Sequence, residues 1–432
     1  MEPSKPTLTS LQSTDTLHST LTLVESSNGQ ENFKSDTQNN DQVPEDVPAP
    51  IDTTRIEEKP SIAKEEIDVV PDGGLRAWLV IFGITCCTFT TFGLTSSWGF
   101  FQAYYQHSLL QSSSPSTIAW IGSIQYALAF LPCMIVGRLF DLGYFHSIFV
   151  SASIILVSAT MLVAQCTVYW QLLLCQGFLS GIACGVIVGP TTAILAQWFK
   201  EKRALALGFT AAGSALGGTL FPITARALLP RIGFPWTVRV IGFIMLTCLL
   251  LANLTVRRRL PPTYPKGPLL GIKPLKSVPF ITYCTATLLV YFGLYTSVLN
   301  GIPEGFSFNL VAIMNGSSGI GRLAAGIIGN RIGPMNHMIP STIVSGLVIL
   351  AWPAVRSQSA FIAVVVVFGF TAGSYSALLW QPILDLGDAD ELSRRVGIMM
   401  IFLACAGLLG PPTAGEVNNA AGMQAMTIYA GT

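Results

Sequence analysis

The sequence predicts an all-α membrane protein whose helices cross a bilayer many times, and three features carry this prediction. Hydrophobic residues make up 51% of the 432 residues, whereas charged residues make up only 11%, against about 25% in soluble domains. The mean hydropathy is +0.56. Water-soluble folds cannot cover so much apolar surface, but a bilayer accepts it when helices satisfy their own backbone hydrogen bonds.

The first element, residues 1–74, differs in composition from the rest of the chain. It holds 15 of the 23 acidic residues but only five of the 24 basic ones, and it is rich in Ser, Thr, Asn and Pro. Such a segment buries too little apolar surface to offset its ordering entropy. We therefore expect a disordered acidic cytoplasmic tail. It lacks the pattern of a cleaved signal peptide, so the first transmembrane helix is expected to direct insertion.

Eleven apolar stretches follow, each close to the 20 or so residues that a spanning helix needs. They cover residues 76–104, 115–137, 147–165, 169–195, 204–229, 235–255, 279–300, 306–328, 338–355, 359–384 and 396–414. A twelfth stretch, residues 420–432, is too short to cross. We therefore expect a truncated twelfth helix.

Basic residues test this count because they concentrate in cytoplasmic loops. Alternate connections hold thirteen of them: Arg138, Lys200, Lys202, Arg203, Arg257, Arg258, Arg259, Lys266, Lys273, Lys276, Arg331, Arg394 and Arg395. The opposite connections hold Arg231 and Arg356. This asymmetry places the N-terminus and residues 256–277 in the cytoplasm.

Residues 256–277 form the longest and most basic connection, and they contain five prolines. We expect this cytoplasmic loop to join an N-terminal six-helix half, residues 75–255, to a C-terminal half, residues 278–432. The second half would contain helices seven to eleven and a stub of helix twelve.

A weak internal repeat supports the two halves. The loop between helices two and three contains residues 137–143, GRLFDLG, and the loop between helices eight and nine contains residues 329–333, GNRIG. An Arg/Asp pair can join neighbouring helix ends and release them when the halves move. We therefore expect a conformational latch, formed by Arg138, Asp141, Arg331, Lys202 and Arg203. The alternative is that these are basic loop residues with a role in topology alone.

Four further stretches resemble one transporter family. They are residues 71–78 (PDGGLRAW), 198–208 (WFKEKRALALG), 306–322 in helix eight and 409–415 (LGPPTAG) at the expected end of helix eleven. They resemble the monocarboxylate-porter branch of the major facilitators, in particular its fungal members, and the repeated loops resemble the G-x-x-x-D-R-x-G signature of that superfamily. The resemblance implies the major facilitator fold, with two six-helix halves and a truncated twelfth helix.

Arg322 lies near the middle of helix eight. A charge at mid-span costs about 2.5–3.5 kcal/mol on insertion scales, so it should face a wet cavity or a partner. The resemblance implies a substrate role, because monocarboxylate porters bind the anionic group of the substrate with an arginine here. A planar guanidinium suits a carboxylate. The alternative is a structural salt bridge, or an arginine capped by backbone carbonyls that makes no contact with a substrate. Better-known animal members have an aspartate where this chain has Ser318, and a lysine in the stretch matching residues 93–97.

Other candidates for binding a substrate are uncharged residues within the predicted spans. They are Asn315, Gln125, Tyr126, Tyr291, Tyr295 and Trp380. Each could equally form an interhelical hydrogen bond or an interfacial anchor. Together they indicate an aromatic, amide-lined pocket able to hold a solute larger than lactate.

We expect no enzyme, metal site or cofactor. The nine cysteines and four histidines show no metal-ligand spacing, and no His, Asp or Ser/His constellation is clustered at one depth. The predicted partners are the lipid bilayer and a small-molecule substrate, not nucleic acid; proton coupling stays open.

The predicted function is secondary active transport of a small organic solute by alternating access. The solute would be monocarboxylate-like or a secondary metabolite. One alternative is export of a biosynthetic-cluster metabolite rather than nutrient uptake. Another is a non-transporting sensor or an inactive truncated paralogue. We expect a multi-pass protein of the plasma membrane, with a vacuolar or other internal membrane as the alternative.

Overall fold

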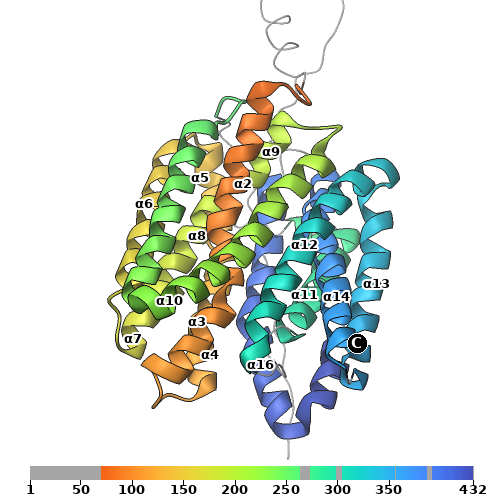
Figure 1. The fold of residues 1–432 in the computed structure, drawn as a ribbon. Helices are drawn as coiled ribbons and strands as arrows, with labels where there is room; N and C mark the ends of the chain where they lie inside the picture. Colours follow the sequence, from red (N-terminus) through yellow and green to blue (C-terminus); the bar gives the residue numbers. More distant parts are fainter. Residues whose placement is uncertain (1–69, 263–272, 298–303, 356, 387–391, 432) are drawn as a thin grey trace, which may run out of the picture. The chain divides into compact units, whose positions relative to one another are not determined.

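Helices are the only regular elements in the described residues of the computed structural model, which are 70–262, 273–297, 304–355, 357–386 and 392–431 (Figure 1). The first part of the chain contains α2 (Leu75–Ser96), α3 (Trp98–Tyr104), η2 (Tyr105–Leu109), α4 (Pro115–Phe130), α5 (Cys133–Asp141), α6 (Phe145–Val163), α7 (Tyr169–Leu172), η3 (Leu173–Leu179), α8 (Ser180–Val188), α9 (Thr191–Trp198) and α10 (Arg203–Thr255). The second part contains η4 (Lys273–Lys276), α11 (Val278–Ser297), α12 (Glu304–Ile332), α13 (Pro334–Ala351), η5 (Trp352–Ala354), α14 (Gln358–Leu378), α15 (Gln381–Asp385) and α16 (Leu392–Gly431).

The eleven predicted spans each coincide with helix. Among the described residues, nine helical stretches are long and apolar enough to cross a membrane. One of them, α10, contains two predicted spans, because the chain turns at Gly233 with a φ of 72°. Glycine adopts a positive φ without the steric cost that a Cβ brings. The described apolar part of α11, Val278–Leu294, is shorter than the others.

Several predicted spans are interrupted rather than straight. α2 ends at Ser96, and α3 begins at Trp98. Proline marks two other breaks, at Pro132 between α4 and α5 and at Pro190 between α8 and α9. Proline has no backbone N–H and its ring crowds the preceding turn, so a helix kinks or breaks there.

The predicted end of helix eleven at residue 414 is wrong. α16 continues through Pro411 and Pro412 to Gly422, which has a φ of 79°, and a short helix follows it to Gly431. Proline is tolerated inside membrane helices because neighbouring groups satisfy the freed carbonyls. The short final helix packs against α11, since the ring centres of Tyr429 and of Phe292 in α11 lie 5.8 Å apart.

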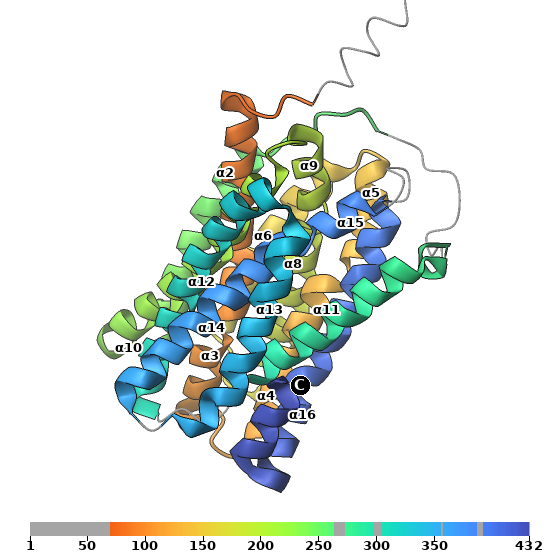
Figure 2. The same ribbon diagram turned by 90° about the vertical axis from the view of Figure 1, so that its right-hand side faces the viewer.

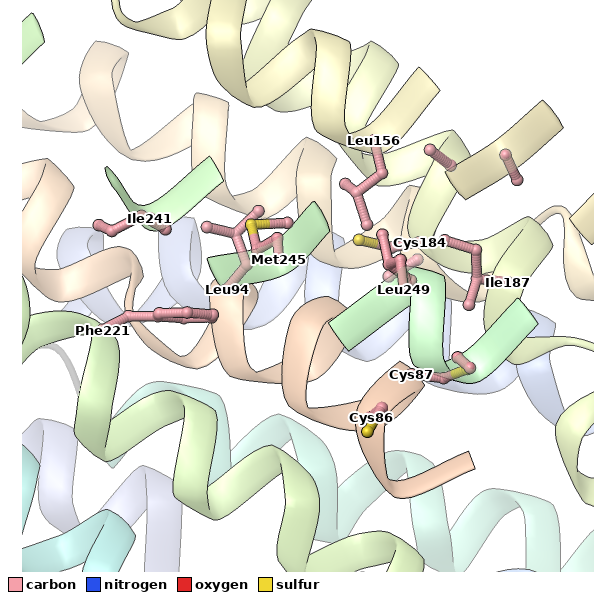
Figure 3. Close-up of a cluster of buried hydrophobic side chains, with 14 of the residues drawn as sticks. Cys86, Cys87, Leu94, Leu156, Cys184, Ile187, Phe221, Ile241, Met245 and Leu249 are labelled. Carbon is pink, nitrogen blue, oxygen red and sulfur yellow. The ribbon is translucent and has the colours of Figure 1, made fainter. Parts of the chain in front are cut away.

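The later part of α10, after Gly233, packs into the first part of the chain (Figure 3). Its Met245 and Leu249 lie in one buried apolar cluster with Leu94 of α2, Leu156 of α6 and Ile187 of α8. This packing leaves the earlier part of α10 and α4 to meet the second part of the chain.

The contacts that join the two parts of the chain are made mainly by α10 with α12 and by α4 with α16. Figures 1 and 2 show α12 beside the earlier, lighter green part of α10. Gly208 of α10 and Gly326 of α12 face each other, and a Cβ added to Gly208 would lie 2.9 Å from the Cα of Gly326. Small residues permit this close approach where lipid supplies no hydrophobic drive.

Candidate functional site

A cavity of about 230 Å³ lies where the two parts of the chain meet. Its lining includes Thr88, Phe92, Thr95, Ser96, Trp98, Ser123, Tyr126, Thr191, Thr192, Thr210 and Ser214 from the first part. The second part contributes Tyr291, Met314, Asn315, Ser318, Arg322, Phe368, Ser376 and Trp380. The cavity therefore brings together side chains that are up to about 300 positions apart in the sequence.

Arg322 of α12 lines this cavity and is half-buried. Its Nη1 donates a hydrogen bond of 2.7 Å to the carbonyl of Ala211 and another to the hydroxyl oxygen of Ser214. Both acceptors belong to α10, and both are neutral. These two hydrogen bonds join the guanidinium on α12 to the facing part of α10.

Asn315 makes a second contact of the same kind. Its Nδ2 donates to the carbonyl of Gly218 on α10 at 3.1 Å. Asn315 and Arg322 are seven residues apart, which places them on the same face of α12 two turns apart. Ser318 lies between them on that face and also lines the cavity. The α12 face thus carries a polar stripe that meets α10.

Three aromatic candidates complete this region. The Tyr126 hydroxyl donates to the carbonyl of Thr95 at 2.9 Å, and Tyr126 and Tyr291 both line the cavity. Trp380, between α14 and α15, lines the cavity as well. Aromatic side chains from both parts of the chain therefore line the same cavity as Arg322.

Two of the predicted binding residues are placed differently. Gln125 is buried but is not among the residues that line the cavity. Neighbouring residues on a helix point about 100° apart, so when Tyr126 faces the cavity Gln125 faces elsewhere, and its backbone packs against Gly181 of α8. The side chain of Tyr295 lies outside the described residues.

The hydroxyl groups on α2, α9 and α10 are the lining residues that sequence reasoning missed. They belong to Thr88, Thr95, Ser96, Thr191, Thr192, Thr210 and Ser214. A signal existed for two of them, because Thr88 and Thr95 are seven residues apart and share a face of α2. Threonine is common on packed faces of membrane helices, so that spacing alone did not distinguish a cavity.

Electrostatically, Arg322 is the single charged side chain among the described residues that line the cavity. In the part of the chain that the structure describes, the acidic residues after residue 75 lie between helices or at helix ends, or beyond the prolines of α16. The cavity therefore favours an anion over a cation. Among the described residues there is also no group of three His, Cys, Asp or Glu side chains that could hold a metal ion.

The predicted latch residues lie at the ends of helices, and one of them spans the two parts of the chain. The guanidinium of Arg203 at the start of α10 lies 3.7 Å from the carboxylate of Asp385 at the end of α15. Sequence reasoning missed Asp385. Lys202 and Arg331 are exposed, and the backbone N–H of Lys202 donates to the carboxylate of Asp72 at 3.3 Å.

The other predicted latch residues, Arg138 and Asp141, lie in the last turn of α5. Nearby, Arg258 donates to the carbonyl of Phe140 at 2.9 Å, and its guanidinium lies 4.9 Å from the centre of that ring. Its charge also interacts with Asp141. Arg258 therefore holds the start of the loop of residues 256–277 against the end of α5, and this contact lies within the first part of the chain.

Comparison with known proteins identifies relatives. A family model described as the Major Facilitator Superfamily matches residues 78–411. An MFS-type transporter of Gibberella moniliformis is 36% identical over 82% of this chain and 85% of its own length. An aspyridones efflux protein of Emericella nidulans is 34% identical, over 82% of this chain and 74% of that protein. A fujikurins efflux protein of Gibberella fujikuroi is 33% identical, over 85% and 82%.

A solved structure shares the fold. The human organic anion transporter MFSD10 superposes with a TM-score of 0.64 at 15% identity, covering 82% of this chain and 96% of that one. At this identity the likeness shows the arrangement of helices alone.

Proposed function

The chain belongs to the Major Facilitator Superfamily, and we propose that it exports a small organic anion of secondary metabolism through the cavity around Arg322. Membership makes the chain a multi-pass membrane transporter of small organic solutes. The class of solute, the direction of transport and the residues that bind the solute are proposed on the grounds below.

The inference that the solute is an anion rests on the charge of Arg322. A cation in a membrane cavity is costly unless it is used, and the groups that accept its hydrogen bonds on α10 are a carbonyl and a hydroxyl. Arg322 is also the one charged side chain among the described residues that line the cavity. We infer that a carboxylate or enolate of the solute binds there, with the aromatic residues Tyr126, Tyr291 and Trp380 against its apolar part.

The direction is inferred from relatives. Two of them are named as efflux proteins, for aspyridones and for fujikurins. The cavity, at about 230 Å³, suits a solute with more apolar surface than lactate. These observations favour export of a metabolite over uptake of a nutrient, and we propose that this chain transports actively rather than serving as a sensor.

We further place the chain in the monocarboxylate-porter branch of the superfamily. The P-D-G-G motif supports this, because its Asp72 has a structural role. The carboxylate of Asp72 accepts hydrogen bonds from the backbone N–H groups of Lys200 and Glu201, at 2.6 and 2.8 Å. This contact joins two of the stretches that carry the resemblance. Asp72, just before α2, is thereby fixed to the start of α10.

The proposal also covers location, domains and chemistry. We place the protein in the plasma membrane, with the N-terminus and residues 256–277 in the cytoplasm. Residues 256–277 would join the two halves of the transporter, residues 75–255 and residues 278–432. We assign the protein no catalytic step. The basic loops support this topology. An N-terminal epitope tag should bind antibody only after permeabilisation; binding to intact cells would contradict the topology.

The test uses purified protein in lipid vesicles and two probes that differ in charge, 3-hydroxybenzoate and its neutral amide, 3-hydroxybenzamide. We expect the wild type to transport the carboxylate and Arg322→Gln to lose that transport, while Arg322→Lys retains part of it. Arg239→Gln is the matched control, because Arg239 stacks on Trp236 and lies outside the cavity lining. Equal carboxylate transport by the wild type and Arg322→Gln would remove the arginine from the mechanism.

The same vesicles measure proton coupling when a pH gradient is imposed. We infer that protons do not cross through a carboxylate relay, because no Asp or Glu stands at mid-span in the sequence. If a gradient drives transport, the proton would travel on the weak acid itself. Gradient-driven transport of a permanently charged sulfonate would contradict this inference.

A further inference from the structure

Five hydroxyl groups that line the cavity share one property: each donates its hydrogen to a helix carbonyl. Thr88 donates to Thr85 (3.0 Å) and Thr210, Thr95 to Phe92 (3.0 Å), Thr191 to Val188 (2.6 Å), Thr210 to Leu207 (3.0 Å) and Ser214 to Ala211 (2.8 Å). All five residues are more than nine-tenths buried. Ser123 of α4 differs, because its buried hydroxyl has no hydrogen-bond partner among the described residues.

This property determines what the wall can bind. A hydroxyl has one hydrogen and two lone pairs, so a hydroxyl that donates to its own helix can offer a ligand only lone pairs. Ser214 demonstrates this state. Its oxygen accepts a hydrogen bond from Arg322, and a guanidinium has donors but no acceptor.

The acceptors lie close to the cationic end of the cavity. Thr210 is four residues before Ser214 on α10, which is about 6 Å along the helix axis. Thr88 of α2 is beside Thr210, because its hydroxyl donates to the Thr210 carbonyl. Acceptor oxygens therefore begin at the guanidinium and continue about one helical turn away from it.

We propose that Thr88, Thr210 and Ser214 form an acceptor wall that selects solutes with a hydroxyl or N–H group about one helical turn from their anionic group. This inference rests on the proposed function, in which the anionic group binds Arg322. A solute without that donor leaves buried lone pairs with neither water nor a partner, which is more costly than losing one hydrogen bond to water. Sites of this kind reject analogues that lack the donor.

The test compares 3-hydroxybenzoate with 3-methoxybenzoate, whose oxygen cannot donate. Dissociation constants are measured calorimetrically on the full-length protein in lipid nanodiscs. We expect the wild type to bind the hydroxyl compound about three- to tenfold more tightly, the ratio that one hydrogen bond supplies. Thr88→Val, which removes the oxygen but keeps the shape, should bring this ratio near one.

Thr90→Val is the matched control. Thr90 belongs to the same helix, is fully buried and donates to the carbonyls of Cys86 and Cys87, but it does not line the cavity. It should keep the wild-type ratio, and any loss of folding common to buried threonines would appear in both variants.

The outcomes separate the two proposals. A wild-type ratio near one, with the carboxylate still bound better than 3-hydroxybenzamide, overturns the acceptor wall and leaves the anion site. A retained hydroxyl preference in a protein that binds carboxylate and amide equally overturns the anion site instead. Failure of both benzoates to bind at millimolar concentration refutes both.

Discussion

Replacing Gly208 by alanine tests whether the contact between α10 and α12 separates during transport. A Cβ on Gly208 would lie 2.8 Å from the carbonyl oxygen of Arg322 and 2.9 Å from the Cα of Gly326. Both are backbone atoms, which cannot swing aside as a side chain can. The two helices would have to part by about 0.7 Å to reach the roughly 3.5 Å of an ordinary contact.

The size of the effect follows from this clash. Overpacking of one methyl group costs about 1–3 kcal/mol. Alanine also gains about 1 kcal/mol in helix propensity, but this gain is present in every conformation in which α10 stays helical, so it cancels from the equilibrium between them. We therefore expect Gly208→Ala to shift the population away from the observed conformation by about five- to 150-fold.

A second glycine distinguishes a shift in conformation from a loss of stability. Gly217 of α10 packs against Phe89 and Gly93 of α2, and its Cβ would lie 2.7 Å from the Cα of Gly93. Because α2 and α10 belong to the same proposed half, Gly217→Ala should lower the unfolding midpoint without changing the conformational equilibrium. Gly316→Ala is the control, since a Cβ there meets no atom within 4 Å.

Spin labels at Glu201→Cys and Asn330→Cys report the distance between the corresponding ends of α10 and α12, since both residues are exposed. The exposed Cys405 is first replaced by serine. Pulsed electron paramagnetic resonance should show longer distances in Gly208→Ala than in the wild type, Gly217→Ala or Gly316→Ala. An unchanged distribution in Gly208→Ala would show that this contact does not separate.

Two further predictions concern the helix ends. We expect transport to slow by less than about fivefold in Arg203→Gln, in Asp385→Asn and in the double variant, because a partly exposed ion pair is worth at most about 1 kcal/mol. Initial transport rates measure this. If the losses of the two single variants add up in the double variant, the two charges do not interact. Asp72→Ala should lower the free energy of unfolding by about 0.5–2 kcal/mol, since the carboxylate caps the backbone N–H groups before α10. Thermal midpoints measure this against Glu201→Gln, and equal midpoints for the two variants would contradict the cap.

Sequence reasoning located the spans because apolar length and loop charge are set by the bilayer, and no tertiary contact needs to be known. It failed where local rules depend on neighbours. Pro411 and Pro412 would end a helix in water, yet α16 passes through them and turns at Gly422 instead. In lipid, unpaired backbone N–H and C=O groups cost free energy. A kinked helix whose freed carbonyls bond to neighbouring groups is therefore favoured over a helix that ends inside the membrane.

The binding residues predicted from the sequence and the residues that line the cavity overlap only in part. Arg322 was predictable because a charge at mid-span is rare and expensive. Gln125 and Tyr126 are both polar and adjacent, and only packing against α8 decides which one faces the cavity. Ser214 and Asp385 carried no signal, because each gains its partner from the other part of the chain.

Under the proposed function, the polar contacts between α10 and α12 would link solute binding to movement. Arg322 donates to Ala211 and Ser214, and Asn315 donates to Gly218, so one face of α12 holds α10 through hydrogen bonds. Such bonds inside a membrane are worth only about 0.6 kcal/mol on average. An anion that binds Arg322 competes for the same guanidinium, and a charged acceptor is stronger than a neutral one. If an anion binds Arg322 as proposed, we expect it to weaken the contact that keeps α10 and α12 together, in the region where Gly208 and Gly326 allow the two helices to approach closely.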